Sequence, residues 1–236
     1  MFRLAFLLVM LSSRCGVDPA TIAPDPFPVS LRSRFIATKT LTELARADRV
    51  EELVPAEANW RVFNVRRIEL MALHGDSAHW RGDGRALTDE MKAALSGMRI
   101  SDNYRVAASA KGELKHPPGE QPFELVHYVS VVPEQEAEHP LGRVGFAEAV
   151  RSALAEAVEA AHVDPYAVQP GRLEFTVDAS GAIASIRLAS SCGYPDLDRA
   201  TESALSAIPG SWTAARNASG FPVAQTFSLF FGSFGC

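Results

Sequence analysis

The C-terminal part of the chain predicts a small α+β domain in which a three-stranded antiparallel sheet carries helices on one face. Three observations predict it. Two segments of alternating polarity are joined by a turn, a third alternating segment follows near the C-terminus, and two segments carry apolar residues at helical spacing. The order is helix, strand, strand, helix, strand. Elements in this order can bury one face of the sheet under both helices.

The first two strands are predicted as a hairpin. Residues 172–178 alternate apolar and polar side chains, as a half-buried strand does. Asp178–Gly181 reads Asp-Ala-Ser-Gly, which favours a turn, and the alternation resumes over residues 184–188. The third strand is predicted over residues 223–231, where Val, Phe, Leu and Phe recur after a turn.

Two helices complete the predicted domain. Phe146–Ala161 and Leu197–Ile208 each carry an apolar stripe near period 3.6. Pro195 suits the first turn of the second helix, and Pro209-Gly210 ends it. We place Trp212 in the core rather than in a ligand site.

The preceding residues, 31–133, predict another α+β domain. Leu31–Val54 and Leu87–Met98 show helical spacing, whereas Trp60–Leu73 and Pro122–Val132 are rich in strand-forming residues. The acidic segment PEQEAEHP then lies between two prolines. We therefore place a linker at residues 134–140 and the C-terminal domain at 141–236.

Residues 1–15 predict a secretory signal peptide. Arg3 precedes an apolar run, Leu4–Leu11, which is shorter than the ~20 residues that cross a bilayer. A buried N-terminal strand or helix is the alternative. Cys15 lacks the small preceding residue of a lipid-attachment signal, so a periplasmic protein is expected rather than a membrane-anchored one. Residues 16–30 read as an extended, proline-rich lead-in.

Composition and motifs argue against several classes of function. The net charge of −5 and the absence of a basic cluster give no support for nucleic-acid binding. No nucleotide-binding or hydrolase motif occurs, so we expect no enzyme, no cofactor and no catalytic residue. No metal is expected, because His74, Asp76 and His79 lack an evident further metal ligand. Ser190-Ser191 is not expected to be a nucleophile, because no base is evident near it.

The C-terminal residues resemble the TonB C-terminal domain family. The matching text is GRLEFTVDASGAIASIRLASSCGYPDLDRATESAL, followed by SGFPV and a terminal strand. The family's ordered features correspond to the turn Asp178–Gly181, the corner Ser190–Gly193, the helix start Leu197–Ala200 and the strand opening Gly220–Val223. The resemblance covers about residues 140–236.

This sequence also departs from the family. Cys192 interrupts the Ser-Ser-Gly corner, and Trp212–Ala215 replaces the usual Phe-x-Pro-Ala. A long helix stands in place of the Tyr-Pro-x-x-Ala opening, as in the related TolA C-terminal domain. The sequence shows neither the membrane-spanning anchor nor the long proline-rich linker of an energy transducer, so partner binding is expected rather than energy transduction.

The resemblance implies a periplasmic module that recognises envelope proteins by strand addition, a segment of an outer-membrane transporter being the family's partner. We expect the last strand to lie at a sheet edge, where unpaired backbone groups accept an extended peptide. The predicted binding residues are Pro222, Val223, Ala224, Gln225, Thr226, Phe227 and Ser228. The edge could instead be covered by the upstream domain. A structural envelope protein that forms a homodimer through this module is the alternative function.

An internal similarity suggests that a degenerate copy of the module precedes it. LTDEMKAALSGM at 87–98 matches LDRATESALSAI at 197–208, and residues 104–112 align with 212–220. Pro122 would then correspond to Pro222. Chance similarity between two amphipathic helices is the alternative.

The strand order implied by the resemblance also suggests a disulfide. It places Cys192 and Cys236 at the same end of the sheet, about two strand spacings (~10 Å) apart, and pliant flanking segments could bring them within bonding distance. One pair of cysteines in an exported protein favours a bond. Two free thiols are the alternative.

Overall fold

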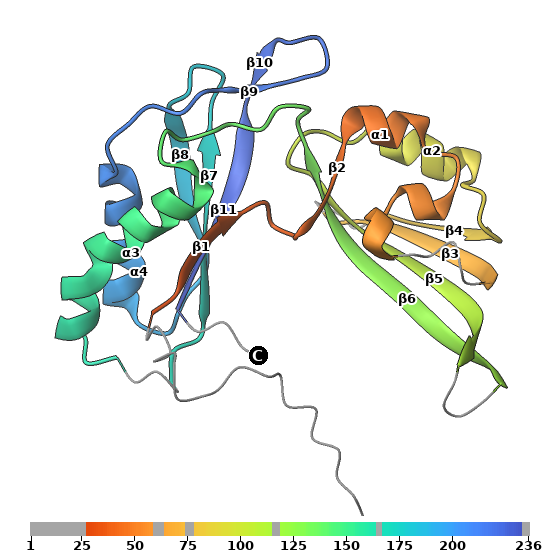
Figure 1. The fold of residues 1–236 in the computed structure, drawn as a ribbon, viewed down its shortest axis with the longest axis horizontal. Helices are drawn as coiled ribbons and strands as arrows, with labels where there is room; N and C mark the ends of the chain where they lie inside the picture. The colour runs from red at the N-terminus through yellow and green to blue at the C-terminus, as the bar shows by residue number, and fades with distance from the viewer. Residues whose placement is uncertain (1–26, 59–63, 74–77, 115–118, 164–166, 233–236) are drawn as a thin grey trace, which may run out of the picture.

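The computed structural model describes residues 27–58, 64–73, 78–114, 119–163 and 167–232. Within these ranges eleven strands form three sheets, and the chain builds two neighbouring units (Figure 1). The fold is mixed α/β, but the expected small three-stranded sheet is wrong. The two main sheets have four and five strands. They are larger because segments not predicted as strands, including 29–32 and 103–114, pair into them.

The N-terminal unit contains the five-stranded sheet, in the order β2-β6-β5-β3-β4. Its strands are β2 (Ala37–Thr40), β3 (Asn64–Ala72), β4 (His79–Asp83), β5 (Asn103–Leu114) and β6 (Gly119–Val132). Only the β2–β6 pair is parallel. The helices α1 (Leu41–Arg46) and α2 (Asp89–Ser96) lie over one face, with two short 3₁₀ turns, Val50–Glu52 and Ala56–Ala58 (Figure 1).

The predicted helix over 31–54 is wrong for most of its length. Only α1 is α-helical there, and two short strands precede it. Thr40 caps α1 by a reciprocal pair of hydrogen bonds with Glu43, a capping box that fixes where the helix starts. Of the residues whose spacing predicted this helix, Leu44 of α1 and Val50 of a 3₁₀ turn are buried, whereas Ala45 is exposed.

β5 was not predicted as a strand, although its sequence carries the signal. Tyr104, Val106, Ala108 and Ala110 alternate along it and are all buried against the helices. Alanine is a weak strand former, so the alternation is less visible than in a Val- or Ile-rich segment.

The C-terminal unit contains the four-stranded sheet, in the order β1-β11-β7-β8, with every neighbouring pair antiparallel. Its strands are β1 (Val29–Arg32), β7 (Pro170–Val177), β8 (Ile183–Ser190) and β11 (Gln225–Gly232). The helices α3 (Gly142–Ala160) and α4 (Pro195–Ala207) cover one face (Figure 1). β9 (Ala215–Arg216) and β10 (Pro222–Val223) form a small ribbon beside it. The predicted hairpin, both predicted helices and the last strand are confirmed.

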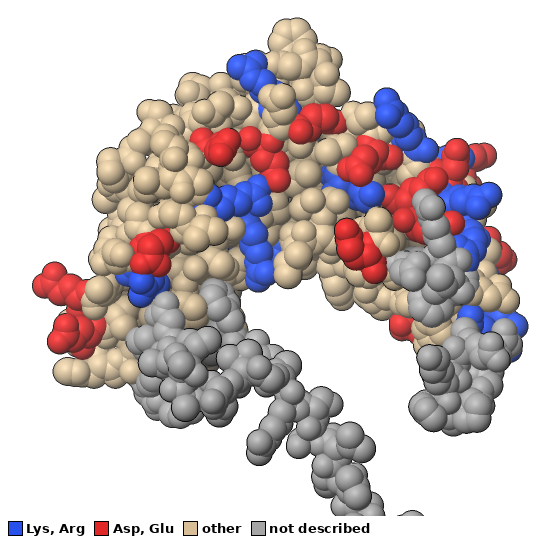
Figure 2. Space-filling view, viewed as in Figure 1, with Lys and Arg blue, Asp and Glu red and all other residues tan. Residues whose placement is uncertain are grey.

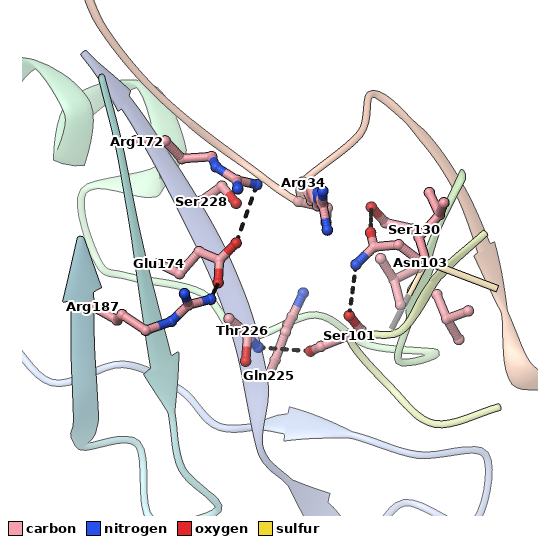
Figure 3. Close-up of a pocket in the computed structure, with 14 residues that line it drawn as sticks. Arg34, Ser101, Asn103, Ser130, Arg172, Glu174, Arg187, Gln225, Thr226 and Ser228 are labelled. Atoms are coloured by element: carbon pink, nitrogen blue, oxygen red, sulfur yellow. Dashed lines mark hydrogen bonds and ion pairs between the residues drawn. The ribbon is translucent and has the colours of Figure 1, made fainter. Parts of the chain in front are cut away.

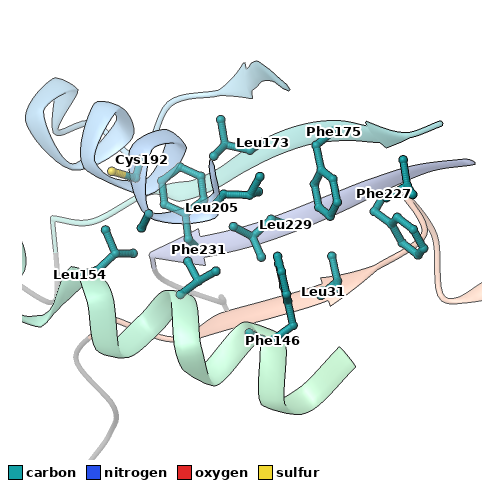
Figure 4. Close-up of a cluster of buried hydrophobic side chains, with 14 of the residues drawn as sticks. Leu31, Phe146, Leu154, Leu173, Phe175, Cys192, Leu205, Phe227, Leu229 and Phe231 are labelled. Carbon is teal, nitrogen blue, oxygen red and sulfur yellow. The ribbon is translucent and has the colours of Figure 1, made fainter. Parts of the chain in front are cut away.

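Aromatic side chains fill the space between this sheet and its helices (Figure 4). Phe175 and Leu205 are fully buried, as the sequence predicts, and Trp212 is 5% exposed. The Trp212 ring lies 5.1–5.7 Å from the rings of Phe146, Phe175 and Phe227. Trp212 is therefore a core residue, as expected.

The acidic segment 134–140 runs along the C-terminal unit. Gln135 and Glu138 form antiparallel bridges with Arg216 and Thr213, and Ala137 is buried. The segment therefore belongs to the surface of that unit, although its composition predicts a solvated linker.

The two units share one chain order. Helix, strand, strand, helix, strand is α1-β3-β4-α2-β5 in the first unit and α3-β7-β8-α4-β11 in the second. The corresponding strands are neighbours in the same order, β5-β3-β4 and β11-β7-β8. α2 thus corresponds to α4, as the internal similarity suggests. β5 corresponds to β11 rather than to residues 212–220, and Pro122 lies in β6, which extends the first sheet.

No helix in the described ranges is long and apolar enough to cross a lipid bilayer. The predicted signal peptide, residues 1–15, lies outside the described residues, and so does most of the predicted lead-in, 16–30.

Candidate functional site

The predicted partner-binding strand lies inside a sheet rather than at its edge. β11 pairs with β7 on one side and with β1 on the other, where Ser228–Phe231 face Val29–Arg32. Leu31 of β1 is only 7% exposed, so this pairing also buries apolar surface. The expected open edge is thus filled over these four residues by a segment of the same chain.

The other predicted binding residues have separate structural roles. Pro222 and Val223 pair with β9, Ala224 is exposed, and Phe227 is buried in the core. The Gln225 side chain is buried, where its Oε1 accepts a hydrogen bond from Ala137 N at 2.7 Å and its Nε2 donates to Glu136 Oε2 at 2.6 Å. Gln225 therefore holds the acidic segment against the sheet.

Thr226 directs its backbone N–H away from β7, as strand addition at this position requires. The acceptor, however, is the Ser101 hydroxyl of the N-terminal unit, with N and Oγ 2.8 Å apart. Ser101 holds a positive φ of 75°, which is uncommon for a residue other than glycine. This bond connects the two units at the edge where a partner peptide was expected.

The predicted disulfide is not formed by Cys192, which is a free, fully buried cysteine. Its side chain points into the core of the C-terminal unit (Figure 4). Burial raises the pKa of the thiol to about 11, so the reactive thiolate is disfavoured. Cys236 lies outside the described residues.

A polar cleft of about 290 Å³ lies between the two units (Figure 3). β7 and β8 contribute Arg172, Glu174 and Arg187, and the segment between β1 and β2 contributes Ser33 and Arg34. The rest of the lining is mostly polar: Leu73, Ser101, Asn103, Ser130, Val131, Val132, Gln225, Thr226 and Ser228. The cleft thus includes three of the predicted binding residues.

Positive charge dominates the cleft. Arg172 and Arg187 both pair with Glu174, the former at 3.1 Å between Nη1 and Oε1. The pKa of Arg172 lies below its ordinary value, first because its guanidinium is desolvated and further because Arg34 and Arg187 carry like charge nearby. Glu174 opposes this shift. The lining therefore contains one carboxylate and three guanidinium groups.

Hydrogen bonds hold the wall formed by the N-terminal unit. Ser130 Oγ accepts from Phe35 N at 2.9 Å and donates to Asn103 Oδ1 at 2.7 Å. Asn103 Nδ2 donates in turn to Ser101 O at 3.1 Å. The Ser33 hydroxyl, by contrast, is buried without a hydrogen-bond partner among the described residues. Most buried hydroxyls have a partner, so Ser33 is an exception in this part of the cleft.

An open backbone edge lies beside the cleft. β2 pairs only with the last four residues of β6, Val129–Val132, and no strand of the described chain pairs with the outer side of β6 before them. Val131 N donates to Asp102 O on the β5 side. Because backbone groups alternate along an antiparallel pair, Glu124, Val126 and Tyr128 direct their N–H and C=O groups outward. The parallel register that places Ala37 opposite Val129 engages the Tyr128 C=O, so the edge is open at Glu124 and Val126.

Sequence reasoning did not identify the arginine residues of the cleft. The available signal was the polar side of the predicted strand 172–178, where Arg172 and Glu174 alternate with core residues. No local sequence pattern indicated that Arg34 lies in a cleft, because its position depends on the pairing of β1 and β2 in different sheets. Of the two histidines considered as metal ligands, His79 Nε2 lies 3.4 Å from Glu69 Oε2, and His74 lies outside the described residues.

The charged residues of the lining can hold an anion. They include no histidine, cysteine or aspartate, and their single carboxylate, Glu174, is already held by two guanidinium groups. Guanidinium groups bind carboxylates and phosphates through paired hydrogen bonds. In the part of the chain that the structure describes, no group of three or more potential metal ligands occurs.

No family model, no curated protein and no solved structure matches this chain, so the resemblance to the TonB C-terminal domain stays a prediction.

Proposed function

We propose that this chain is a protein-binding module of the bacterial periplasm that recognises an extended segment of another envelope protein by strand addition. The acceptor is the outer edge of β6. The observation that carries the proposal is the row of outward backbone groups at Glu124 and Val126, which no other described strand pairs with. Such a row offers main-chain hydrogen bonds to any extended peptide.

The side chains around this edge support the same role. Val126 is 37% exposed and Tyr128 46% exposed, and Ile36, which precedes β2 at the end of the edge, is 82% exposed. Exposed apolar residues beside an open edge favour aggregation unless a partner covers them. Pro122 occupies an outward position, where it has no N–H to offer, and so limits the length of the acceptor.

The shape of the molecule favours a single extended peptide as the occupant. Figure 1 places β6 on the side of its sheet that faces the C-terminal unit, and Figure 2 shows the surface hollowed between the two units. One added strand needs only about 5 Å beside β6. A second copy of the whole chain would have to fit its own sheet into the same hollow.

The test compares three forms of the full chain as affinity baits in envelope extract. Val126→Pro removes one outward N–H and places a ring on the edge, whereas Val126→Thr keeps the N–H and the branched shape. We expect the same discrete proteins to bind wild type and Val126→Thr and to be lost with Val126→Pro. Circular dichroism and the unfolding midpoint show that each variant is folded.

A photo-cross-linking residue at position 126 identifies the occupant. The matched control carries it at Val144 of α3, which is 86% exposed and lies on the other unit. An adduct with another envelope protein at position 126 alone supports the proposal. Adducts only between two copies of this chain, or capture that Val126→Pro leaves unchanged, would overturn it. The first of these outcomes would favour a homodimeric structural protein.

A further inference from the structure

We infer that the cleft between the two sheets is a binding site for a carboxylate-bearing ligand, with Arg34 and Arg172 as the groups that hold it. The site does not depend on strand addition at β6, because it is built from side chains rather than from an open backbone edge. The cleft and the edge are adjacent, since Ser130 and Val132 at the end of β6 line the cleft.

The charge of the cleft favours a negative partner. Its lining contains three arginine residues and one glutamate, which leaves two positive charges uncompensated on a chain whose net charge is −5. The Arg172 side chain is 19% exposed, so water screens it only partly. Like charges held together in a partly desolvated cleft oppose one another, and an anion between them relieves that cost.

Arg34 is the group most available to a ligand. Within the described ranges its guanidinium makes no hydrogen bond or ion pair, and it lies 5.2 Å from the ring of the neighbouring Phe35. Figure 3 shows its side chain projecting into the cleft, across from Arg172 and Glu174. Its planar group can therefore donate two parallel hydrogen bonds to one carboxylate.

Glu174 shows that this site accommodates a carboxylate. Its two oxygens bind different arginines, Oε1 with Arg172 and Oε2 with Arg187. A ligand carboxylate between Arg34 and Arg172 would repeat this arrangement on the opposite side. Ser33, which is 4% exposed, also lines the cleft, and its hydroxyl has no hydrogen-bond partner among the described residues.

The size of the cleft limits the ligand. A volume of about 290 Å³ accommodates a small dicarboxylic acid or one or two acidic side chains of a polypeptide. The two uncompensated charges match two carboxylates. Both sources present the same chemistry to the arginines, and titration distinguishes them.

The experiment measures binding to the full chain by calorimetry at constant ionic strength. The probes are succinate, a short peptide with two adjacent aspartates, its asparagine counterpart, and inorganic phosphate. We expect saturable binding of at least one carboxylate probe, weakening as salt rises, and none of the asparagine peptide. Binding of succinate indicates a free acid as ligand, and binding of the aspartate peptide alone indicates an acidic segment of a protein.

Variants assign the binding to the cleft. Arg34→Gln should lower the affinity of the bound carboxylate about tenfold or more, since it removes one charge-assisted pair of hydrogen bonds. Arg34→Lys should recover part of that loss, because lysine keeps the charge without the planar fork. Arg46→Gln is the matched control, since it changes net charge equally at an exposed position on α1.

Three outcomes would overturn the inference. They are no saturable binding of any carboxylate probe, equal losses in Arg34→Gln and Arg46→Gln, and tighter binding of phosphate than of either carboxylate. Val126→Pro, which tests strand addition, leaves the arginine residues intact. The inference of a carboxylate site in the cleft and the proposal of strand addition at β6 can therefore be refuted independently.

Discussion

Leu31→Ala tests whether β1 is part of the C-terminal core or only an extended lead-in to it. Leu31 is 7% exposed and faces Leu229 of β11 in the strand register. The substitution removes three carbons, and at about 0.8 kcal/mol for each buried CH₂ the transfer term is roughly 2.4 kcal/mol. β1 is an edge strand, so its surroundings can partly close over the space. We therefore expect a loss of about 2–3 kcal/mol, at the lower end of buried Leu→Ala changes.

Urea unfolding measures this loss. Trp212 reports on the C-terminal core when Trp60 and Trp80 are replaced by Phe, and the midpoint and slope give the free energy of unfolding. Ser30→Ala is the control, because Ser30 lies on the same strand but alternates to the other face of the sheet. It should change stability by less than about 0.5 kcal/mol. If Leu31→Ala costs no more than Ser30→Ala, then β1 is not part of this core and does not fill the edge beside β11.

Three further predictions concern the core, a buried histidine and the N-terminus. Phe175→Ala and Leu205→Ala should each cost about 2–5 kcal/mol in the same assay, since both side chains are fully buried, and losses under about 1 kcal/mol would contradict the packing. Burial lowers the pKa of His139, so its contribution to stability is present above about pH 6.5 and is lost as pH falls below that value. Unfolding midpoints between pH 7.5 and 5 should accordingly fall less in His139→Phe than in wild type, and equal slopes would refute this role. Mass spectrometry of the mature protein should show an N-terminus beyond Leu11, whereas an intact Met1 in the cytoplasm would exclude export.

Elements with local signals were predicted well. The Asp178 carboxylate accepts hydrogen bonds from Ser180 N and Ala182 N, so the turn that the sequence indicates is stabilised by its own first residue. Pro195 begins α4 as expected. In these segments the periodicity, the turn residues and the core-facing side chains agree, and no distant partner is needed to decide the structure.

Elements that depend on distant pairing were not predicted. Val29–Arg32 carries only four residues of strand, and it becomes β1 because β11, almost 200 positions later, offers it backbone partners and a place for Leu31. The arginine residues of the cleft could not be predicted for the same reason. Arg34 and Arg172 are far apart in the sequence, and they line one cleft because β1 and β2 join different sheets.

The position of an open sheet edge is therefore a property of the whole chain. The sequence indicates that β11 has the alternation of a strand with one polar face, and the structure directs the Thr226 N–H outward as a binding edge would. What no local pattern reveals is that β1 and Ser101 already satisfy that side of the strand. An unpaired edge invites association with other chains, and filling it within the chain removes that risk. On β6 the equivalent cover, β2, pairs with only four residues, so the backbone at Glu124 and Val126 is left open. If strand addition operates in this protein, the physical chemistry of backbone pairing therefore places it on β6 and not on the strand that resembles the family's binding edge.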